Sequence, residues 1–415
     1  MTESSDACVN SNSLDGIRVL DLSRILAGPT ATQLFGDLGA DILKIEHPKL
    51  GDDTRGWGPP FATDSDGNET SESAYYLCVN RNKRSVAIDI SKQEGQTLVK
   101  KLLANCDVLV ENFKVGSLEK YGLDYQSLKT EFPELIYCSI TGYGQTGKNA
   151  AKPGYDALAQ AAGGIMSITG EPAGFPMKVG VGIADIMCGM YAAVAMLAAL
   201  RHRDRTKCGQ HIDVSLLDTQ LAWLANAGSY FLTSGNEPPR FGNAHPNIAP
   251  YKTYEVSDGY MVLGVGNDRQ FVDFCMFAGI ENIAKDTRFN TNANRIRNRE
   301  ALEVLLEPIL MEKTRQQWMH GLEPLKVPCG PVNSIGEALT NEHAIERNII
   351  SNIPYLHNES GVFSFVSNPL KFSKTPPKYR YAPPILGEQT ADILKEFLDI
   401  EEPQLSKLRD EQIIK

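Results

Sequence analysis

The feature that most constrains the fold of this chain is an alternation of short apolar runs with helical segments, which starts close to the N-terminus. An apolar, β-branched run over 17–23 precedes a helical segment over 28–39, and a second apolar run follows over 40–47. Pro29 falls in the first turn of the helical segment, where its missing N–H is harmless. This order of segments predicts a βαβ unit.

Three further apolar runs, over 85–90, 107–113 and 135–144, extend the alternation. Repeated alternation of this kind predicts an α/β fold with a parallel sheet and helices on both of its faces. No G-x-G-x-x-G follows the first run, which favours a doubly wound scaffold without NAD. The sequence also lacks the G-x-S-x-G elbow and the Walker A loop, which argues against the usual serine hydrolases and phosphate-transfer enzymes.

The character of the sequence changes at 233–250, a stretch rich in Pro, Gly and Asn that reads as a linker or an ordered loop. Apolar runs on both sides of Ser257–Gly259 then predict a β-hairpin, and helical segments continue to about residue 322. A second domain is therefore expected to begin in this region. The Pro-rich stretch that follows predicts irregular connections before a last helix near 388–398.

Composition argues against several classes of function. The 415 residues carry a formal net charge of −10 and no long basic run, so nucleic acid is not expected as a partner. Eight widely spaced cysteines predict free thiols, and the histidines show no metal-binding spacing, so no metal site is predicted. The longest apolar stretch, 183–200, contains Asp185 and many small residues, which favours a buried helix over a membrane span.

Asp185 is the first candidate for chemistry. It follows the pattern Gly180-x-Gly182 at the start of a helical segment that runs to about Arg203. From the residues alone, the preferred interpretation is a helix cap or a first-turn aspartate that complements the helix dipole. The alternative is an ionised nucleophile beside glycines that let a ligand approach the backbone. The two interpretations are compatible.

Asn112 and Phe113 end one of the predicted strands, and Lys114 and Lys120 follow around a glycine turn. Ligands of doubly wound sheets bind at the carboxyl ends of strands, so an amide, an aromatic ring and two cations suit an adenine and its phosphates. The alternative is a solvated helix start with two surface lysines.

Two other segments are open to two interpretations. Arg81, Lys83 and Arg84 precede a strand, where they form either an anion clamp or an exposed charged turn, and the exposed turn is favoured for at least two of them. The segment over 240–251 supplies either a mobile glycine loop over a ligand or only turns.

Eight segments spread over 14–398 resemble, in the same order, the class III CoA-transferase family of CaiB/BaiF type, which includes formyl-CoA and carnitine CoA-transferases. They include "RILAGPTATQLFGDLGADILKIEHPKLGDDTR", "VENFKVGSLEKYGL", "KPGYD" and "ITGEPAGFPMKVGVGIADIMCG". The resemblance implies a large Rossmann-like domain built from both chain ends, a smaller inserted α+β domain and an interlocked homodimer. It divides the chain into a flexible N-terminus (1–13), the first part of the large domain (14–225), the small domain with its linkers (226–325) and a returning C-terminal part (326–415).

The same resemblance assigns roles to individual residues. It implies that Asp185 is the catalytic nucleophile. The CoA-binding positions that it and the strand-end pattern predict are Leu26, Ala27, His47, Ile88, Asp89, Ile90, Ser91, Asn112, Phe113, Lys114, Lys120, Tyr155 and Asp156. Leu26 stands where formyl-CoA transferase has a glutamine and His47 where it has an arginine. These departures argue against formyl-type chemistry at position 26 and a phosphate contact at position 47.

The chemistry expected from the resemblance is a double displacement. Asp185 attacks the donor thioester to give a mixed anhydride, the released thiolate converts it to an aspartyl-CoA thioester, and the acceptor carboxylate reverses these steps. Backbone N–H groups at the helix start or in glycine loops are expected to stabilise the oxyanions. CoA thioesters are then substrates, and no permanently bound cofactor is predicted.

The segments are most similar to mitochondrial members of the family that activate glutarate, which implies succinyl-CoA or hydroxymethylglutaryl-CoA as donor. A dicarboxylate acceptor needs a cation for its distal carboxylate, for which Arg24, Arg81 and Lys178 are candidates. Gly242 and His245 lie in the segment expected to exclude water from the site. A mitochondrial location is therefore expected, although the polar N-terminus lacks the pattern of a transit peptide, and the alternative is a cytoplasmic location.

Two other functions compete with CoA transfer. An acyl-CoA racemase of the same fold carries a catalytic histidine in a "GHD" segment where this chain has Gly154, Tyr155 and Asp156, and Tyr155 argues against racemisation. A non-catalytic acyl-CoA-binding protein would tolerate loss of the Asp185 carboxylate.

Overall fold

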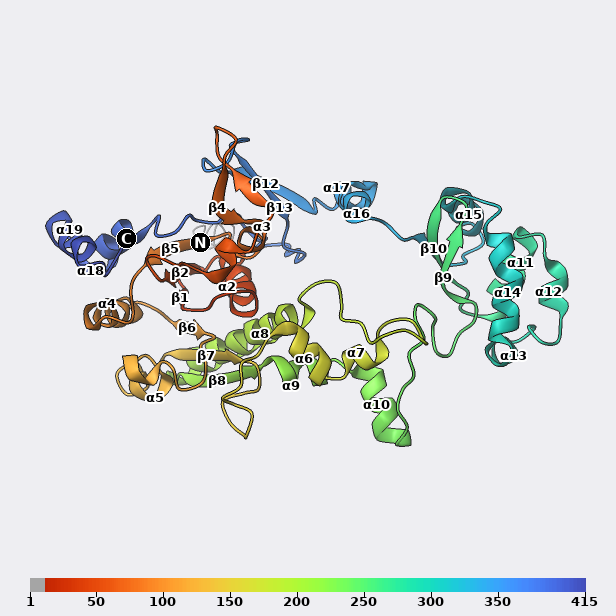
Figure 1. Ribbon diagram of the computed structural model, residues 1–415, viewed down its shortest axis with the longest axis horizontal. Helices are drawn as coiled ribbons and strands as arrows, with labels where there is room; N and C mark the ends of the chain where they lie inside the picture. Colours follow the sequence, from red (N-terminus) through yellow and green to blue (C-terminus); the bar gives the residue numbers. More distant parts are fainter. Residues whose placement is uncertain (1–11) are drawn as a thin grey trace, which may run out of the picture. The chain divides into compact units, whose positions relative to one another are not determined.

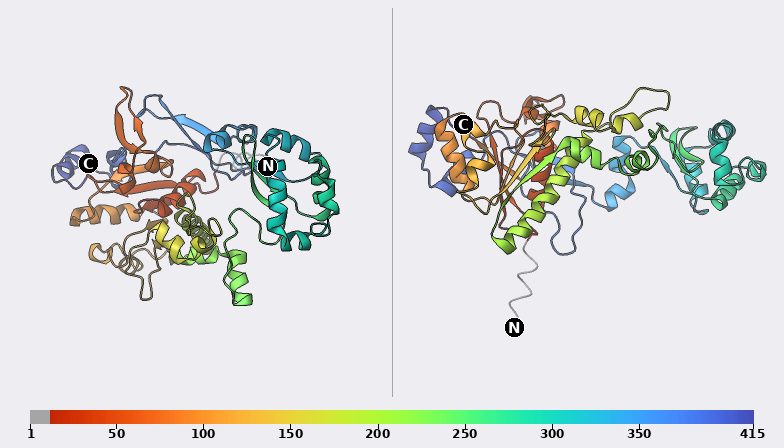
Figure 2. Two further views of the ribbon diagram at one scale, coloured as in Figure 1. Left: turned by 45° about the vertical axis from the view of Figure 1, so that its right-hand side comes forward. Right: turned by 90° about the horizontal axis from the view of Figure 1, so that it is seen from below.

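The computed structural model describes residues 12–415 (Figures 1 and 2), so nearly all of the predicted flexible N-terminus, 1–13, lies outside the described residues. The described chain divides into two compact units. The first unit contains 12–165, 178–232 and 346–415, and the second contains 166–177 and 233–345. The large unit is thus built from both ends of the chain and the small one is inserted.

The boundaries between the units differ from the predicted 225/226 and 325/326. Helix α10 (Ala225–Ser234) continues across the first predicted boundary. The short segment 166–177 joins the second unit because the guanidinium of Arg240 donates hydrogen bonds to the carbonyls of Glu171 (3.2 Å) and Gly174 (2.6 Å).

The first unit is organised around a six-stranded sheet in the order β5-β2-β1-β6-β7-β8, in which every neighbouring pair is parallel. In chain order these are the third, second, first, fourth, fifth and sixth strands, the arrangement of doubly wound nucleotide-binding folds. The sheet confirms the predicted α/β class. The strands are β1 (Arg18–Asp21), β2 (Asp41–Glu46), β5 (Lys83–Ala87), β6 (Val108–Glu111), β7 (Ile136–Thr141) and β8 (Gln210–Ser215).

Each face of this sheet has its own hydrophobic core, because successive side chains of a strand point to opposite faces. In β1, Val19 belongs to one core and Leu20 to the other. The Val19 face is covered by α2 (Ala27–Asp37) and α8 (Ile183–Thr206). The Leu20 face is covered by α4 (Gln93–Leu103), α18 (Thr390–Leu398) and α19 (Glu402–Asp410), which lie side by side in Figure 2.

Helix α8 is long and apolar enough to cross a membrane by length and composition alone. In the first unit it instead packs against α2, α9 and the strands β7 and β8, and it buries Cys188, Ala192 and Met196 in the core. Only part of the predicted burial is found, because Tyr191, Val194 and Leu197 of α8 stay exposed.

The C-terminal segment returns to the sheet beside β5. The backbone N–H of Asp89 donates to the carbonyl of Ile413 (2.8 Å), and Ile88 forms an isolated antiparallel bridge with Ile414. The hydroxyl of Thr390 accepts the N–H of Ala87 (2.9 Å). The last residues of the chain therefore border the segment that follows β5. Before them come α18, α19 and a hairpin of β12 (Ile350–Pro354) and β13 (Val362–Val366).

The second unit is α+β, as predicted. Its antiparallel sheet has the order β11-β10-β9, and the β9–β10 hairpin turns at Ser257 and Asp258, within the predicted turn. Trp318, Phe271 and Phe274 are buried between this sheet and the helices. The elements are β9 (Tyr251–Val256), β10 (Gly259–Gly264), β11 (Cys329–Pro331), α11 (Asp268–Phe277), α12 (Glu281–Lys285), α13 (Asn292–Arg297), α14 (Arg299–Leu310), α15 (Arg315–Leu322) and α16 (Ile335–Thr340).

The remaining elements are short. They are η1 (Asp53–Gly56), β3 (Phe61–Thr63), β4 (Glu69–Ser73), α3 (Ala74–Leu77), η2 (Glu119–Tyr121), α5 (Tyr125–Leu128), α6 (Asp156–Ala162), α7 (Ile165–Ile168), α9 (Leu216–Ala222) and α17 (Glu342–Glu346).

Candidate active site

The strand order places a crevice between β1 and β6, where the direction of sheet winding reverses, and ligands of such sheets bind at the carboxyl ends of these strands. The loops that leave these two strands are joined by one amide. The side chain of Asn112 accepts the N–H of Arg24 (2.9 Å) and donates to its carbonyl (2.7 Å). This two-way bond holds the two loops together at the mouth of the crevice.

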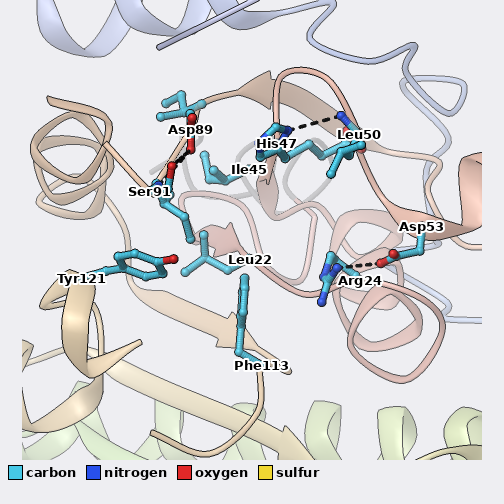
Figure 3. A pocket seen from close by; sticks show the side chains of 14 residues that line it. Leu22, Arg24, Ile45, His47, Leu50, Asp53, Asp89, Ser91, Phe113 and Tyr121 are labelled. Atoms are coloured by element: carbon cyan, nitrogen blue, oxygen red, sulfur yellow. Dashed lines mark hydrogen bonds and ion pairs between the residues drawn. The ribbon is translucent and has the colours of Figure 1, made fainter. Parts of the chain in front are cut away.

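A first cavity, of about 230 Å³, opens beside this bond and is called the His47 pocket (Figure 3). The sequence-predicted residues that line it are His47, Ile88, Asp89, Ile90, Ser91, Phe113 and Arg24. They come together because β5 ends at Ala87, earlier than the predicted 90, which leaves 88–91 as a turn at the carboxyl end of the strand. In that turn the Asp89 carboxylate accepts the N–H (2.9 Å) and hydroxyl (2.6 Å) of Ser91.

Lys120 does not line the His47 pocket, although the neighbouring Tyr121 does. The Lys120 ammonium lies 4.6 Å from the centre of the Tyr121 ring. Tyr121 was missed by sequence reasoning, because an aromatic residue in a short 3₁₀ turn carries no distinctive pattern.

A second cavity, of about 290 Å³, is called the Asp185 pocket, and among the described residues Asp185 is the only acidic one that lines it. It shares Arg24 and Phe113 with the His47 pocket. The other sequence-predicted residues in its wall are Leu26, Ala27, Asn112, Lys114 and Tyr155. Residues that sequence reasoning did not single out include Ile25, Lys152 and Gly154, although the "KPGYD" segment that supplies the last two was among the eight recognised segments.

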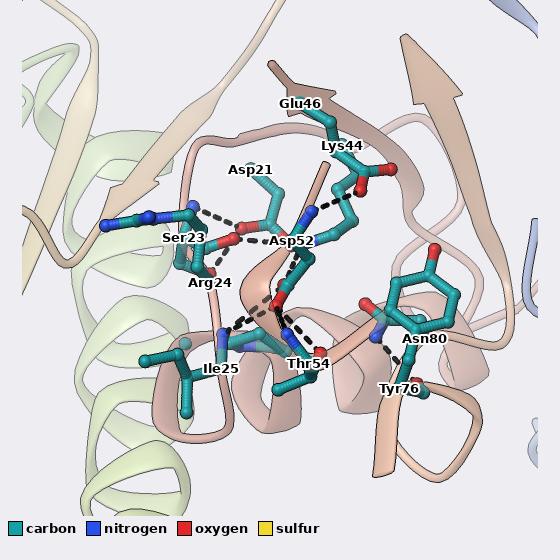
Figure 4. Close-up of polar contacts among 12 residues, drawn as sticks. Asp21, Ser23, Arg24, Ile25, Lys44, Glu46, Asp52, Thr54, Tyr76 and Asn80 are labelled. Carbon is teal, nitrogen blue, oxygen red and sulfur yellow. Dashed lines mark hydrogen bonds and ion pairs between the residues drawn. The ribbon is translucent and has the colours of Figure 1, made fainter. Parts of the chain in front are cut away.

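Ile25, between Arg24 and Leu26, has a φ of +73°, a left-handed conformation that a β-branched residue rarely adopts and that costs roughly 1–3 kcal/mol. Its N–H donates to both carboxylate oxygens of Asp52 (3.2 and 3.3 Å), as Figure 4 shows. Asp52 is in turn held by the ammonium of Lys44 (2.9 Å) and by Thr54. This buried network stabilises the strained turn at Ile25, which places Arg24 and Leu26 in the wall of the pocket.

Asp185 is the third residue of α8, but it does not cap that helix. The carboxylate of Asp156 does so instead, since its Oδ2 accepts the N–H groups of Ala184 (2.8 Å) and Asp185 (3.2 Å). Among the described residues, no donor is hydrogen-bonded to the Asp185 carboxylate. Asp185 is therefore a first-turn aspartate, as one part of the preferred interpretation has it, but it is not the cap, which comes from a residue predicted to contact CoA.

Burial, followed by the nearby charge of Asp156, raises the pKa of the half-buried Asp185 to about 7. The helix dipole and first-turn N–H groups would normally stabilise an anion at this position. Here those N–H groups are occupied, which also corrects the expectation that the start of α8 supplies oxyanion donors.

Three cations line the Asp185 pocket. The Arg24 guanidinium pairs with Asp53 (2.7 Å) and lies 5.3 Å from the centre of the Phe113 ring. Lys114 and Lys152 are exposed, and no carboxylate within residues 12–415 forms an ion pair with either of them. With a single acid and these cations, the pocket is suited to anionic ligands.

The expected exposed turn at 81–84 was wrong. Arg81 binds Asp37 through two hydrogen bonds (2.9 and 2.5 Å) and is buried, so it is not available as a substrate cation. Lys83 is fully buried beside Asp21 (3.2 Å), and Arg84 pairs with Asp41. These residues lie at or just before the start of β5, where each forms an ion pair with an aspartate of a neighbouring element.

The other predicted substrate residues lie elsewhere. Lys178 is exposed in the first unit and lines neither pocket; its ammonium donates to the carbonyl of Val179 (3.2 Å). Gly242 and His245 belong to the second unit, where the His245 ring stacks on Tyr251 at 5.2 Å. Their role over the site stays a prediction. Within residues 12–415, no three His, Cys, Asp or Glu side chains gather in a way that could hold a metal ion.

Comparisons with known proteins agree with these features. A family model described as CoA-transferase family III matches residues 14–390. A succinate–glutarate CoA-transferase of Agrobacterium fabrum is 46% identical over 389 residues, which cover 94% of this chain and 96% of that protein. A succinyl-CoA:glutarate CoA-transferase of Mus musculus is 39% identical over 401 residues, covering 97% and 90%. The crystal structure of a CAIB/BAIF family protein from Brucella suis matches with a TM-score of 0.86 at 45% identity, covering 94% and 100%.

Proposed function

The chain belongs to CoA-transferase family III, and from that premise we propose that it moves coenzyme A from succinyl-CoA to glutarate through a covalent intermediate on Asp185. It is an enzyme whose substrates are CoA thioesters and carboxylic acids. The single observation that carries the residue assignment concerns residues 12–415: there the Asp185 carboxylate accepts no hydrogen bond and is the only acid in a pocket lined by three cations. A carboxylate nucleophile needs this combination of a free oxygen and anion-binding surroundings.

The proposed reaction begins when an Asp185 oxygen attacks the carbonyl carbon of succinyl-CoA. The carbon–sulfur bond breaks, CoA leaves as a thiolate, and a mixed anhydride remains on Asp185. The thiolate then attacks the aspartyl carbon of the anhydride, which releases succinate and leaves CoA on Asp185 as a thioester. Glutarate attacks the aspartyl carbon of this thioester, so that CoA leaves again as a thiolate and a glutaryl–aspartyl anhydride forms. The thiolate then attacks the glutaryl carbon, which releases glutaryl-CoA and the Asp185 carboxylate, so that atoms and charge balance.

The two pockets suggest how the CoA moiety lies. The His47 pocket has an apolar wall from Leu22, Ile88 and Phe113, with the polar turn 88–91 at its edge, which suits an adenosine. Arg24 lines both pockets and so suits the phosphates between the two ends of CoA. Asn112 and Phe113 then lie along the path of the pantetheine arm toward Asp185.

The distal carboxylate of glutarate is proposed to bind Lys152. This lysine lines the Asp185 pocket but not the His47 pocket, and no acid among the described residues neutralises it. Lys114 meets the same conditions but also lines a neighbouring cavity with Glu119 and Asp124, which favours Lys152. Arg24, a predicted candidate, is already partly neutralised by Asp53. Lys152 therefore replaces Arg81 and Lys178 as the candidate for this role.

Oxyanion stabilisation is proposed to come from the start of α2, not from α8. Leu26 and Ala27 line the Asp185 pocket, and within residues 12–415 no acceptor is bonded to the N–H groups of Ala27 and Gly28. Each such donor is worth roughly 3–4 kcal/mol in well-studied acyl transfer.

Mass spectrometry tests the proposal directly. After mixing with succinyl-CoA, the wild-type chain is expected to carry CoA as a thioester on the peptide that contains Asp185, and glutarate should discharge it. Asp185→Asn should fold, bind succinyl-CoA and show neither the adduct nor transfer. Transfer by Asp185→Asn at the wild-type rate would remove Asp185 from the mechanism, and hydroxymethylglutaryl-CoA in the same assay tests the alternative donor.

Two further expectations, the interlocked homodimer and the mitochondrial location, stay predictions. Similar proteins come from a bacterium and from a mouse, so the comparisons do not select a compartment. For the racemase alternative, Tyr155 lines the pocket at the position of the expected histidine and is more than half exposed. A phenol in place of the imidazole that racemisation uses as its base favours transfer over racemisation.

A further inference from the structure

The N–H groups of the first four residues of α8 are all hydrogen-bonded within the chain. The N–H of Ile183 donates to Val181 (2.8 Å) and that of Ile186 to Gly182 (3.0 Å). The two N–H groups between them, those of Ala184 and Asp185, donate to Oδ2 of Asp156. The position that an anion would take at this helix start is therefore filled by a carboxylate of the chain itself.

Asp156 is itself held firmly. It is the first residue of α6, and one turn later the amide of Gln160 donates to its Oδ1 (2.5 Å). Gln160 is fully buried, and its amide oxygen accepts the N–H of Val179 (2.9 Å). Gln160 thus accepts a backbone N–H before the glycine turn that leads into α8, and Asp156 accepts two after it.

The geometry points to Asp156 as a positioning residue. Its carboxylate occupies N–H groups at the start of α8, so that the Asp185 carboxylate accepts no hydrogen bond there and faces the pocket. This inference rests on the proposed function, in which Asp185 is the nucleophile. An acid at the third helical position can accept the N-cap N–H, as in a capping box, but the Asp185 carboxylate accepts no such bond from Gly182. Such bonds would cover the oxygens that have to attack.

The charge of Asp156 has a second consequence for the reaction. It opposes the ionised form of Asp185, whereas the mixed anhydride and the aspartyl-CoA thioester carry no charge at that position. Asp156 therefore favours the covalent forms over the free enzyme. The raised pKa of Asp185 reports the same preference, because the protonated carboxyl is neutral as well.

Besides Asp156, the charge of Asp185 acts on Tyr75 and Cys188, and neither of them is an acid hydrogen-bonded to its backbone. The titratable groups on the packed elements and in the pocket wall are Tyr75 of α3, Cys138 of β7, Cys188 of α8, His211 and Asp213 of β8, Asp218 of α9, Arg24, Lys114, Lys152 and Tyr155. Helix α2 contributes only Asp37, at its far end. Removal of the Asp156 charge should therefore lower the pKa of Asp185.

Asp156→Asn tests the inference, since the new side chain keeps an oxygen that can accept the N–H groups of Ala184 and Asp185. The acid limb of the kcat/KM profile should move to lower pH, and the fraction of enzyme that carries CoA after mixing with succinyl-CoA should fall severalfold. Asp124→Asn is the matched control, because Asp124 caps α5 in the same way and lines neither pocket. It should leave the acid limb and the CoA-bearing fraction unchanged.

A soluble, folded Asp156→Asn with the wild-type acid limb and the wild-type fraction of CoA adduct would reduce Asp156 to a structural cap and overturn the inference. Asp156→Ser, another neutral capping residue, takes its place if the asparagine variant does not fold, with the same expected shifts. Absence of any adduct in the wild-type enzyme would instead overturn the proposed function. The two failures are therefore distinguishable.

Discussion

Oδ2 of Asp52 lies 2.9 Å from Nζ of Lys44, and neither side chain has any exposed surface. The same carboxylate accepts the N–H of Ile25, the residue with the left-handed backbone at the wall of the Asp185 pocket. A fully buried ion pair therefore holds a strained turn in the active site (Figure 4).

Replacing Asp52 with asparagine should lower the free energy of unfolding by about 3 kcal/mol, because it leaves the Lys44 ammonium buried without its closest partner. Urea unfolding measures the loss. Asp53→Asn is the control, since Asp53 pairs with Arg24 at the surface and should cost ~1 kcal/mol or less. Equal losses in the two variants would show that the buried pair does not support the turn.

The Lys44–Asp52 pair also predicts an acid sensitivity. The Lys44 charge and the bonds from Thr54 outweigh the effect of burial and lower the pKa of Asp52 to about 2, below its ordinary 3.8. Between these values the unfolded chain binds more protons than the folded chain, so stability present above about pH 4 is lost as the pH falls toward 2. The stability difference between wild type and Asp52→Asn should therefore shrink over this range, and a constant difference would contradict the pKa assignment.

Asp185→Asn should make the protein more stable at pH 8. The pKa of Asp185 is raised to about 7, so between 3.8 and 7 the folded chain binds more protons than the unfolded chain, and stability falls as the pH rises through this window. Asparagine resembles the neutral carboxyl and avoids this loss, a gain of ~2 kcal/mol once the partial exposure of the carboxylate is discounted. Unfolding at pH 8 should show the gain, and at pH 4 it should vanish.

Lys152→Met should reduce the preference for a dicarboxylate acceptor. With succinyl-CoA as the donor in both assays, the ratio of kcat/KM for glutarate to that for butyrate is expected to fall about tenfold or more, because a charge-assisted hydrogen bond is worth ~1.5–3 kcal/mol. Lys148→Met, at another exposed lysine of the same loop, should leave the ratio unchanged. An unchanged ratio in Lys152→Met would move the distal carboxylate to another cation.

Deletion of residues 412–415 should loosen the His47 pocket, because Asp89 then loses the carbonyl of Ile413 and Ile88 loses its bridge to Ile414. We expect KM for succinyl-CoA to rise roughly 2–10-fold, as the loss of one hydrogen bond implies, with a smaller change in kcat. Hydrogen exchange at the Asp89 amide should become faster. Lys415→Ala, which keeps this backbone, is the control, and faster exchange with an unchanged KM would show that the tail does not position the pocket.

The sheet could be predicted because its signals are local. Alternation of apolar runs with helical segments is visible within windows of ten to fifteen residues, and the carboxyl ends of parallel strands meet at one edge regardless of the loops between them. Asn112 and Phe113 were therefore placed correctly at the crevice. The exact strand ends were not, since β5 lies two to three residues earlier than predicted.

The polar contacts of the site could not be predicted, because they join residues far apart in the chain. Nothing near Arg81 indicates that Asp37, 44 residues earlier, neutralises it, and nothing near Asp185 indicates that Asp156, 29 residues earlier, caps α8. The left-handed backbone of Ile25 has no local signal at all, since isoleucine is among the residues least expected there. Such contacts depend on how helices and loops pack on the finished sheet.

The contact of the C-terminal segment with the turn after β5 can form only at the end of synthesis on the ribosome. Lys92 and Glu411, which join beside this contact, are 319 residues apart. A ribosome that adds ~5–20 residues per second needs about 15–60 s to cover that distance. Throughout that time the turn after β5 lacks its contacts with Ile413 and Ile414, and the wall of the His47 pocket is completed only when the end of the chain has left the ribosome.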